Sequence, residues 1–365
     1  MKTIVWITPD YFYDVDWPII RSLKNYYDIK WYVIWGTGSL RKKPNNDDVT
    51  SFIQLKYRYR DIRIIKQYWS IIREVKRINP VVVYNAFLGM PYFLPLLFNI
   101  IGSKKIIFEG HEINPYVSAN HDKLSVAYAR YNIRKVGHVQ VFSKHAAEEF
   151  KQLYPGHDCT YVPMVPKDYG DPSRIIEHGG KRVFLFFGSV RSTKRFDVLL
   201  EAFLALDDSH SQKAELWVYG KCDGPEKEKY ESMISGNENI KTMFDFVPDE
   251  LVPELFYSSS YLVQPYQQIT QSGPMMIAYN YGLPIIASDI EGFKERITDG
   301  ENGFLFKKND VNDLRRVLQL CIDQSDGTYN QIKENAIAFA RNEYSPDVVL
   351  DKYKTMIDDF IAKNE

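Results

Sequence analysis

The chain has 365 residues, of which 45% are hydrophobic and 25% charged, and its formal net charge is −1. This composition is typical of a soluble globular protein, and the length favours two domains over one core. The longest apolar run, residues 91–102, is too short to span a bilayer, and residues 1–8 lack the apolar core of a signal peptide.

The three cysteines, Cys159, Cys222 and Cys321, are scattered and have no metal-ligand spacing. They indicate reduced thiols and a cytoplasmic protein. Charge is unevenly distributed, because residues 1–170 contain 24 Lys and Arg against 15 Asp and Glu, whereas the remainder is acidic. The first half is therefore expected to face something anionic.

The first half alternates predicted strands and helices, which is the pattern of a parallel, doubly wound α/β sheet. In such sheets ligands bind beyond the carboxyl ends of the strands. The expected strands are residues 3–8, 29–35, 81–85, 105–109 and 138–142, and the expected helices are 17–27, 63–79, 123–135 and 144–153, the last capped by Ser143.

The loop after the first strand contains Asp14, Asp16 and Trp17. Carboxylates beside aromatic rings suit the hydroxyls and apolar faces of a sugar, so these residues are candidates for binding an acceptor. The alternative is a solvated loop in which Asp16 caps a helix that begins near Trp17. No Gly-x-Gly-x-x-Gly follows the strand, which argues against a dinucleotide site.

His111 follows the end of the strand at 105–109, in a loop with Gly110. A histidine there could donate a hydrogen bond to a ligand or move a proton, or it could be incidental to function. Residues 56–77 form a basic segment whose helical part has apolar residues at helical spacing. Its basic face could rest on anionic lipid or on a diphosphate-linked acceptor, or it could simply be solvated.

Residues 163–182 are rich in Pro and Gly and form the best candidate linker. A new strand is predicted at 183–187, and it is followed by Gly188, Ser189, Arg191 and Lys194 before a helix at 196–206. Glycine after a strand, with two cations at a helix start, favours an anion site. The Gly-Lys-Ser/Thr ending of a Walker loop is missing. Further strands are expected at 215–219, 240–244, 261–263 and 285–287.

The stretch 271–288 predicts a small-residue turn that opens a short helix. Gln271 and Ser272 precede Gly273, and Pro274 suits the first helical position because no amide hydrogen is needed there. The free amides and the dipole at such a helix start attract phosphate, although an ordinary strand–turn–helix–strand unit would look the same. Two α/β domains with phosphate-suited turns in the second suggest a nucleotide held in a cleft between domains.

Together these residues resemble the retaining nucleotide-sugar glycosyltransferases of family 4, which have the two-domain GT-B fold. The resemblance covers nearly the whole chain and is strongest over residues 183–307. It rests on residues 187–194 as a phosphate-binding loop, 220–225 as a loosened Gly-x-Gly-Pro turn, 239–247 as the strand and loop that meet the base, and 282–288 with 292–305 as the closing signature.

The resemblance implies two Rossmann-like doubly wound domains facing across a cleft. Residues 1–165 would bind the acceptor, 166–345 the donor, and 346–365 would form a helix that crosses back to the first domain. The implied chemistry is transfer of a hexose from a UDP- or GDP-sugar to an acceptor hydroxyl with retention, in surface polysaccharide or glycolipid assembly.

The resemblance also implies roles for single residues. His111 would place the donor sugar, and Arg191 and Lys194 would neutralise the departing diphosphate. No cofactor or metal is expected, because no Asp-x-Asp signature is placed to hold Mg²⁺. The donor diphosphate and sugar would contact Gly188, Ser189, Gln271, Ser272, Gly273 and Pro274, and the base would contact Phe246 and Val247.

One departure from the family keeps other functions open. The family often has two glutamates eight residues apart, and their places are taken by Ile269 and Ile277. One alternative is a non-catalytic scaffold that binds sugar nucleotides. Another is a nucleotide-sugar 2-epimerase, for which only Asp14, Asp16 and Glu112 could serve as acid or base. A nucleic-acid binder would need a recognition motif that this sequence lacks. The expected partners are a nucleotide-sugar and a lipid-linked or oligosaccharide acceptor, with peripheral contact of the basic domain at the inner membrane face.

Overall fold

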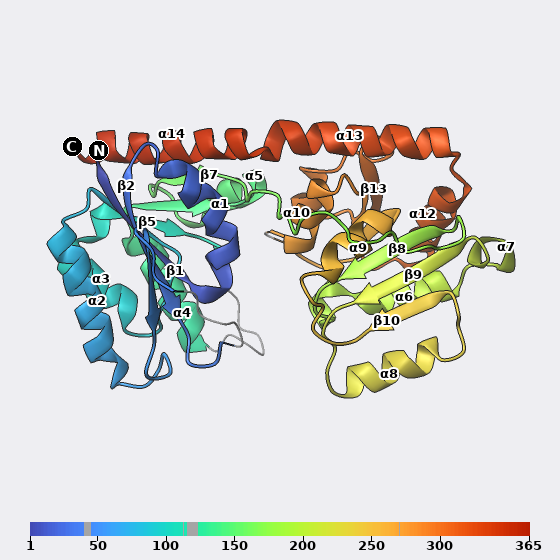
Figure 1. Cartoon of the computed structure of the whole chain (residues 1–365), viewed down its shortest axis with the longest axis horizontal. Coiled ribbons are helices and arrows are strands. Elements are labelled where there is room, and N and C mark those ends of the chain that lie inside the picture. The colour runs from blue at the N-terminus through green and yellow to red at the C-terminus, as the bar shows by residue number, and fades with distance from the viewer. Residues whose placement is uncertain (40–44, 112, 115–122, 270) are drawn as a thin grey trace. The chain divides into compact units, whose positions relative to one another are not determined.

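The computed structural model describes residues 1–39, 45–111, 113–114, 123–269 and 271–365. The chain divides into two compact units (Figure 1). Unit 1 comprises Met1–Val165 and Pro346–Glu365, and unit 2 comprises Pro166–Ser345. No helix in the described part of the chain combines the length and the apolar character that a bilayer crossing requires.

Unit 1 is built on a sheet of seven parallel strands, counted over the described residues, in the order β3-β2-β1-β4-β5-β6-β7. The central strands are almost continuously apolar because helices cover both faces of the sheet. The strand order reverses between β1 and β4, so a crevice is expected at their carboxyl ends. The strands are β1 (Thr3–Pro9), β2 (Asp28–Trp35), β3 (Thr50–Gln54), β4 (Val82–Asn85), β5 (Ile106–Glu109), β6 (His138–Val141) and β7 (Cys159–Tyr161).

Two separate layers of core residues lie on the two faces of this sheet. One layer includes α1 and α14, and the other includes α2, α3 and α5. The α14 helix is tied to the sheet by Tyr353, whose hydroxyl accepts from Nε2 of Gln140 at 3.2 Å. The helices are α1 (Tyr13–Leu23), α2 (Ile64–Ile78), α3 (Phe93–Ile101), α4 (Lys123–Lys135), α5 (Lys144–Leu153) and α14 (Pro346–Asn364), with short 3-10 turns η1 (Asp10–Phe12) and η2 (Ser103–Lys105).

Unit 2 has a parallel sheet of six strands, again counted over the described residues, in the order β10-β9-β8-β11-β12-β13. Its order reverses between β8 and β11. The strands are β8 (Arg182–Phe187), β9 (Ala214–Tyr219), β10 (Ile240–Met243), β11 (Tyr261–Gln264), β12 (Ile285–Ser288) and β13 (Gly303–Phe306). The helices are α6 (Phe196–Leu204), α7 (Asp208–Ser211), α8 (Pro225–Ile234), α9 (Leu251–Ser258), α10 (Gly273–Asn280), α11 (Glu291–Lys294), α12 (Val311–Asp323) and α13 (Asp326–Tyr344), with a 3-10 turn η3 (Ser192–Lys194).

The α/β class and the doubly wound sheets predicted from the sequence are confirmed. The predicted cap of α5 is also present, since Oγ of Ser143 accepts from the amide of Ala146 at 3.0 Å. Three elements of unit 1, β3, α3 and β7, were not predicted.

The prediction for the segment after β1 is wrong. The helix begins at Tyr13, so Asp14, Asp16 and Trp17 lie within α1 and not in a loop. Asp16 does not cap this helix. It is buried against the sheet, where its Oδ2 accepts from Nε1 of Trp6 at 3.0 Å and from Oγ1 of Thr8 at 2.5 Å.

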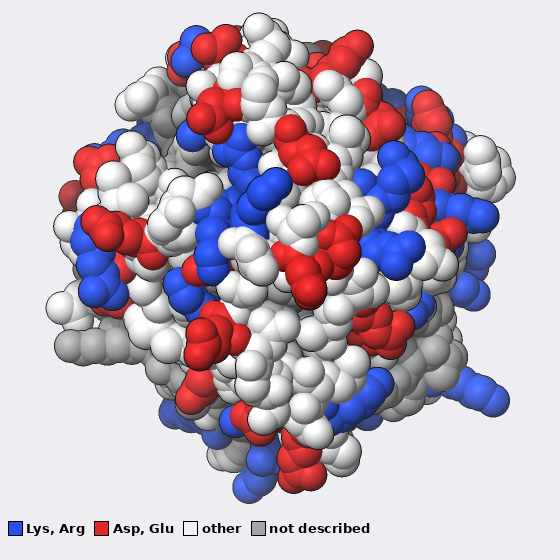
Figure 2. Space-filling view, turned by 90° about the vertical axis from the view of Figure 1, so that its right-hand side faces the viewer, with Lys and Arg blue, Asp and Glu red and all other residues white. Residues whose placement is uncertain are grey.

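The acidic excess of the second half is not gathered into one area on the face of unit 2 shown in Figure 2. Lys and Arg side chains are interspersed with Asp and Glu over that face.

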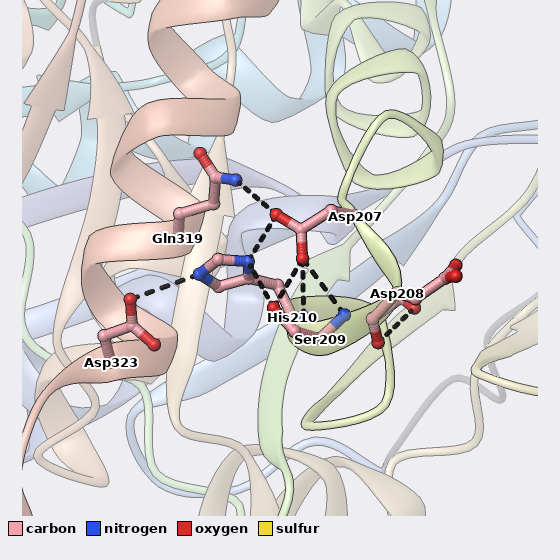
Figure 3. A network of polar contacts seen from close by, with 7 residues as sticks. Asp207, Asp208, Ser209, His210, Gln319 and Asp323 are labelled. Atoms are coloured by element: carbon pink, nitrogen blue, oxygen red, sulfur yellow. Dashed lines mark hydrogen bonds and ion pairs between the residues drawn. The ribbon is translucent and has the colours of Figure 1, made fainter.

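A polar network joins α7 to α12 in unit 2 (Figure 3). Nδ1 of His210 lies 2.7 Å from Oδ2 of Asp207, and its Nε2 lies 3.1 Å from Oδ2 of Asp323. Asp207 also accepts from Nε2 of Gln319 at 3.2 Å and from the hydroxyl of Ser209 at 2.6 Å. Burial disfavours the charged form of His210, but the hydrogen bonds to Asp323 and Asp207 outweigh it and raise its pKa.

The network is expected to stabilise unit 2 most at mildly acidic pH. A histidine whose pKa is raised on folding contributes stability below its unfolded pKa of about 6.5, and loses it as pH rises through the folded value. We expect His210→Ala to lower the unfolding midpoint by a few degrees at most at pH 6, because Asp207 and Asp323 are more than half exposed, and by less at pH 9. Thermal unfolding of both proteins at the two pH values checks this, and an equal effect at both would contradict the role of the charge.

Candidate functional site

The turn after β8 lies at the point where the strand order of unit 2 reverses. The amide of Gly188 donates to the carbonyl of Tyr219 at 2.8 Å, which binds this turn to the end of β9. Gly188 has φ +103° and Gly220 has φ +151°, and a Cβ on Gly220 would lie 2.1 Å from the carbonyl oxygen of Gly188. Gly220 is therefore required for the close approach of the two turns, and Gly188 for its positive φ.

Lys194 folds back over this turn from η3. A Cβ on Gly188 would lie 2.9 Å from Nζ of Lys194 and 3.7 Å from Cγ of Pro274, so these three residues adjoin. Nζ also lies 5.2 Å from the ring centroid of Tyr266, in cation–π contact. Among the residues that the structure describes, no carboxylate forms an ion pair with Lys194.

The environment of Lys194 favours an anionic ligand. Burial lowers the pKa of Lys194 to about 8, and the charge of Arg191 acts in the same direction. A buried lysine whose charge is disfavoured by a neighbouring cation, without a carboxylate to compensate, gains most when an anion binds beside it. Arg191 itself is exposed. The adjacent Arg195 is different, because it is paired with Asp197 at 2.9 Å.

The N-terminus of α10 completes this site. Ser272 caps the helix as predicted, with its Oγ accepting from the amide of Met275 at 3.3 Å. The same Oγ accepts from Nε2 of Gln264 at 2.6 Å, and Gln264 also contacts the hydroxyl of Tyr266 at 3.3 Å. A buried polar chain therefore fixes the start of the helix beside Lys194, where helix amides attract phosphate.

The structure brings together most of the predicted donor residues. Gly188, Lys194, Ser272 and Pro274 adjoin through the contacts above, with Ser189, Gln271 and Gly273 next to them in sequence. Sequence reasoning missed Gln264 and Tyr266. The available signal was their position one and three residues beyond the strand predicted at 261–263.

The two residues predicted for the base lie after β10. Phe246 is 74% exposed, whereas Val247 is buried. An exposed aromatic ring beyond a strand end is suited to stacking on a base, and both assignments remain predictions.

Ile269 and Ile277 occupy the positions at which the family often has two glutamates, and both lie in apolar surroundings. Ile277 is buried in α10. Ile269 packs against Gly292, where an added Cβ would lie 2.6 Å from Cγ2 of Ile269. Neither position offers a carboxylate to a sugar or a ribose.

Unit 1 has a pocket of about 170 Å³ at its own reversal point, beyond the carboxyl ends of β1, β4 and β5. Its walls are mainly apolar side chains from the segment after β4 and from α4, and its polar lining includes Glu109, His111 and Ser125. The volume is comparable with a cavity that accepts a single six-membered ring. Nη2 of Arg60 donates to Oγ of Ser125, one of the lining residues, at 3.0 Å.

His111 is held firmly in this pocket. Its ring is stacked between Phe12, at a centroid distance of 3.8 Å, and Phe142, at 4.8 Å. Its Nε2 lies 2.5 Å from Oε1 of Glu109, the last residue of β5. Sequence reasoning identified His111 but missed Glu109.

The predicted acceptor residues do not share one accessible surface. Asp16 is directed into the interior by Trp6 and Thr8, so it is not placed to receive a sugar hydroxyl. Trp17 packs against Trp31 at a ring distance of 6.0 Å, and Asp14 is half-buried in the first turn of α1. Glu112, considered as an acid or base, lies outside the described residues. Within the described ranges, no group of three or more His, Cys, Asp or Glu side chains is arranged to hold a metal ion.

Comparisons with known proteins address the family and the fold. Residues 181–324 match the family model of glycosyl transferases group 1. An uncharacterised glycosyltransferase of Haemophilus influenzae is 25% identical over 180 residues, which are 48% of this chain and 49% of that protein. A 41.2 kDa protein from the cps region of Klebsiella pneumoniae is 25% identical over 169 residues, 46% of this chain and 44% of its own. The alignments therefore span about half the length of these relatives.

Solved structures match the whole chain at low identity. Sucrose-phosphate synthase from Thermosynechococcus elongatus matches with a TM-score of 0.78 and 11% identity, covering 100% of both chains. HepE from Anabaena, in complex with UDP and glucose, matches with a TM-score of 0.72 and 13% identity, covering 98% of this chain and 100% of its own. These matches confirm the predicted GT-B fold, and with the family match they confirm the resemblance drawn from the sequence.

Proposed function

We infer that this chain belongs to the group 1 glycosyltransferases of the GT-B fold. From this premise, we propose that it transfers a hexose from a nucleoside diphosphate sugar to an acceptor hydroxyl with retention of the anomeric configuration. One observation carries the proposal. Lys194, which has no carboxylate partner among the described residues, lies beside Gly188 and the start of α10 at the strand reversal of unit 2. Such a site is suited to a diphosphate.

In the proposed reaction, the bond between the anomeric carbon and the diphosphate oxygen breaks, and a bond to the acceptor oxygen forms on the same face. The acceptor proton leaves with the departing diphosphate. Arg191 and Lys194 neutralise the charge that develops there, and the amides of Ser189 and Gly273 add hydrogen bonds. His111 places the donor sugar. Each charge-assisted bond contributes about 1.5–3 kcal/mol.

We propose UDP as the donor nucleotide. The support is the likeness to HepE, whose structure contains UDP and glucose. The base would stack on Phe246, which is exposed, and pack beside Val247.

We propose surface polysaccharide or glycolipid assembly as the setting, with a lipid-linked or oligosaccharide acceptor and a cytoplasmic location at the inner membrane face. The relative from the cps region supports the setting. The pocket of unit 1 supports the acceptor, because its apolar walls and its polar lining suit a ring that has both faces and hydroxyls.

One surface of α2, the membrane face, supports contact with lipid. It consists of the exposed side chains Ile62, Lys66, Trp69, Arg73 and Lys76, which are spaced along one side of the helix or just before it. Trp69 is 46% exposed and Ile62 is 69% exposed, although both are large and apolar. A tryptophan among cations suits the boundary of an anionic bilayer, where each cation contributes about 1 kcal/mol.

Flotation with phosphatidylglycerol-containing vesicles tests the membrane face. We expect the protein to float with vesicles at low salt and to be released at high salt, and Trp69→Ser to reduce the floating fraction severalfold. Tyr257→Ser, at an exposed aromatic of unit 2, is the matched control and should float as the parent does. Absence of flotation at low salt would refute this contact.

A scaffold that binds sugar nucleotides without turnover is the second candidate, and the apolar Ile269 and Ile277 favour it. The epimerase alternative is less well supported, because Asp16 is engaged by Trp6 and Thr8. Incubation with UDP-glucose and extracted lipid acceptors, followed by release of UDP and NMR of the product, separates the three. An α-linked product supports the proposal. Binding of UDP-glucose without release of UDP indicates a scaffold, and a sugar whose configuration is inverted at C2 indicates an epimerase.

A further inference from the structure

Tyr266 lies where the two parts of the anion site meet, the anion site being Lys194 together with the start of α10. Tyr266 follows β11 by two residues and is buried, and its carbonyl accepts from Oγ of Ser288, at the end of the adjacent β12, at 2.5 Å. Its ring packs against Phe293 of α11 at a centroid distance of 6.0 Å. The position of this side chain is therefore set by the sheet of unit 2 and by α11.

The ring of Tyr266 serves the charge of Lys194, whose Nζ lies 5.2 Å from the ring centroid. Burial lowers the pKa of Lys194 to about 8, and a cation–π contact becomes stronger as the cation loses water. The charged group that acts on Lys194 is Arg191, which repels it, and no carboxylate within the described ranges pairs with it. The negative face of the ring is therefore the counterpart of this ammonium.

The hydroxyl of Tyr266 belongs to the other part of the site. Nε2 of the buried Gln264 donates to this hydroxyl at 3.3 Å and to Oγ of Ser272, the cap of α10, at 2.6 Å. Burial raises the pKa of Tyr266 above that of an ordinary tyrosine, so the phenol stays neutral near neutral pH. One side chain thus contacts Lys194 with its ring and, by way of Gln264, the cap of α10 with its hydroxyl.

We propose that Tyr266 is a positioning residue that holds the two parts of the anion site in register, with its ring against the ammonium of Lys194 and its hydroxyl linked to the cap of α10. A diphosphate needs both parts at once, because it would receive the charge of Lys194 and hydrogen bonds from the amides at the start of α10. This inference rests on the proposed donor site.

Fluorinated rings test the contact with Lys194. Tyr266→Phe is compared with proteins that carry difluoro- or trifluorophenylalanine at position 266, since each fluorine weakens the negative face and leaves the shape of the ring nearly unchanged. Carbon NMR of lysine labelled at Cε follows the protonation of Lys194, and its signal is identified as the one lost in Lys194→Arg. We expect the pKa of Lys194 to be nearly the same in the parent and in Tyr266→Phe, and to fall stepwise as fluorines are added. A titration of Lys194 that does not move in the fluorinated series would overturn the inference.

Calorimetry of UDP binding tests the hydroxyl. We expect Tyr266→Phe to weaken UDP binding severalfold without moving the titration of Lys194, because the link to the cap of α10 is lost while the ring remains. Tyr257→Phe, at an exposed tyrosine of α9, is the matched control and should bind as the parent does. Parent-like affinity in Tyr266→Phe would also overturn the inference.

Two further outcomes remain decisive. If Tyr266→Phe does not fold, fluorotyrosine at position 266, which keeps the hydroxyl and weakens the negative face, takes the place of the series. If the parent binds no UDP, the proposed donor site fails, whereas the titration of Lys194 still judges the contact with the ring.

Discussion

Replacing Lys194 by alanine is expected to lower kcat/KM for the donor by about 10- to 150-fold. The range corresponds to the loss of one charge-assisted hydrogen bond of about 1.5–3 kcal/mol in the transition state. The reason is structural, because Nζ lies beside Gly188 and Pro274 at the strand reversal and has no carboxylate partner among the described residues. Steady-state kinetics of donor consumption measures the effect, and Lys227→Ala, at a partly exposed lysine of α8, is the control.

The charge of Lys194 should also appear in the pH profile. Burial lowers its pKa to about 8, so the free protein loses this cation as pH rises through 8. We expect kcat/KM of the parent to fall between pH 7 and 9, and that of Lys194→Arg to stay flat there because arginine remains charged. An unchanged kcat/KM in Lys194→Ala, or the same fall in Lys194→Arg, would exclude the assigned role.

Replacing Asp16 by alanine is expected to lower the free energy of unfolding by about 2–6 kcal/mol. Nε1 of Trp6 and Oγ1 of Thr8 would each lose their buried acceptor, and a buried donor without a partner costs about 1–3 kcal/mol. Asp16→Asn keeps an acceptor of the same shape and should cost much less. Urea unfolding measures both variants, and equal losses would show that the hydrogen bonds are not the source.

The pH dependence of this effect has a defined sign. Burial and the charge of Glu109 raise the pKa of Asp16 above its usual value of 3.8, so the folded state binds a proton more tightly than the unfolded chain. The Asp16 carboxyl therefore destabilises the fold increasingly as pH rises above about 4 and through the folded pKa. Asparagine has no such charge. The stability of Asp16→Asn relative to the parent should therefore be more favourable at pH 8 than at pH 5. Parallel curves of unfolding free energy against pH for the two proteins would contradict the raised pKa.

Local signals predicted the elements that depend on local chemistry. The cap at Ser272 with Pro274 in the first turn predicted the start of α10, and β-branched apolar runs predicted most strands. The start of α1 was placed too late, at Trp17, because Asp16 has the side chain of a typical N-cap residue. The helix begins at Tyr13, and Asp16 bonds instead to two residues of β1, a tertiary contact that spacing does not reveal.

The candidate site was predictable where a single segment carries it. Gly188, Arg191 and Lys194 follow one strand, and the sequence placed them together correctly as a turn. Tyr266 and Glu109 were missed because the residues that they contact come from other elements. Such contacts are decided by strand order and side-chain packing, which the local sequence does not show. The acceptor assignment of Asp16 failed for the same reason, since burial of a carboxylate is decided by what packs over it.

Thermal unfolding with UDP, GDP, ADP and CMP tests the central claim, a nucleoside diphosphate site at Lys194, most directly. A ligand at 100 times its dissociation constant adds about 2.7 kcal/mol of stability. The account predicts that one nucleotide, UDP, raises the unfolding midpoint of the parent and that Lys194→Ala removes most of this shift. No shift with any nucleotide, or a shift that Lys194→Ala leaves intact, would contradict it.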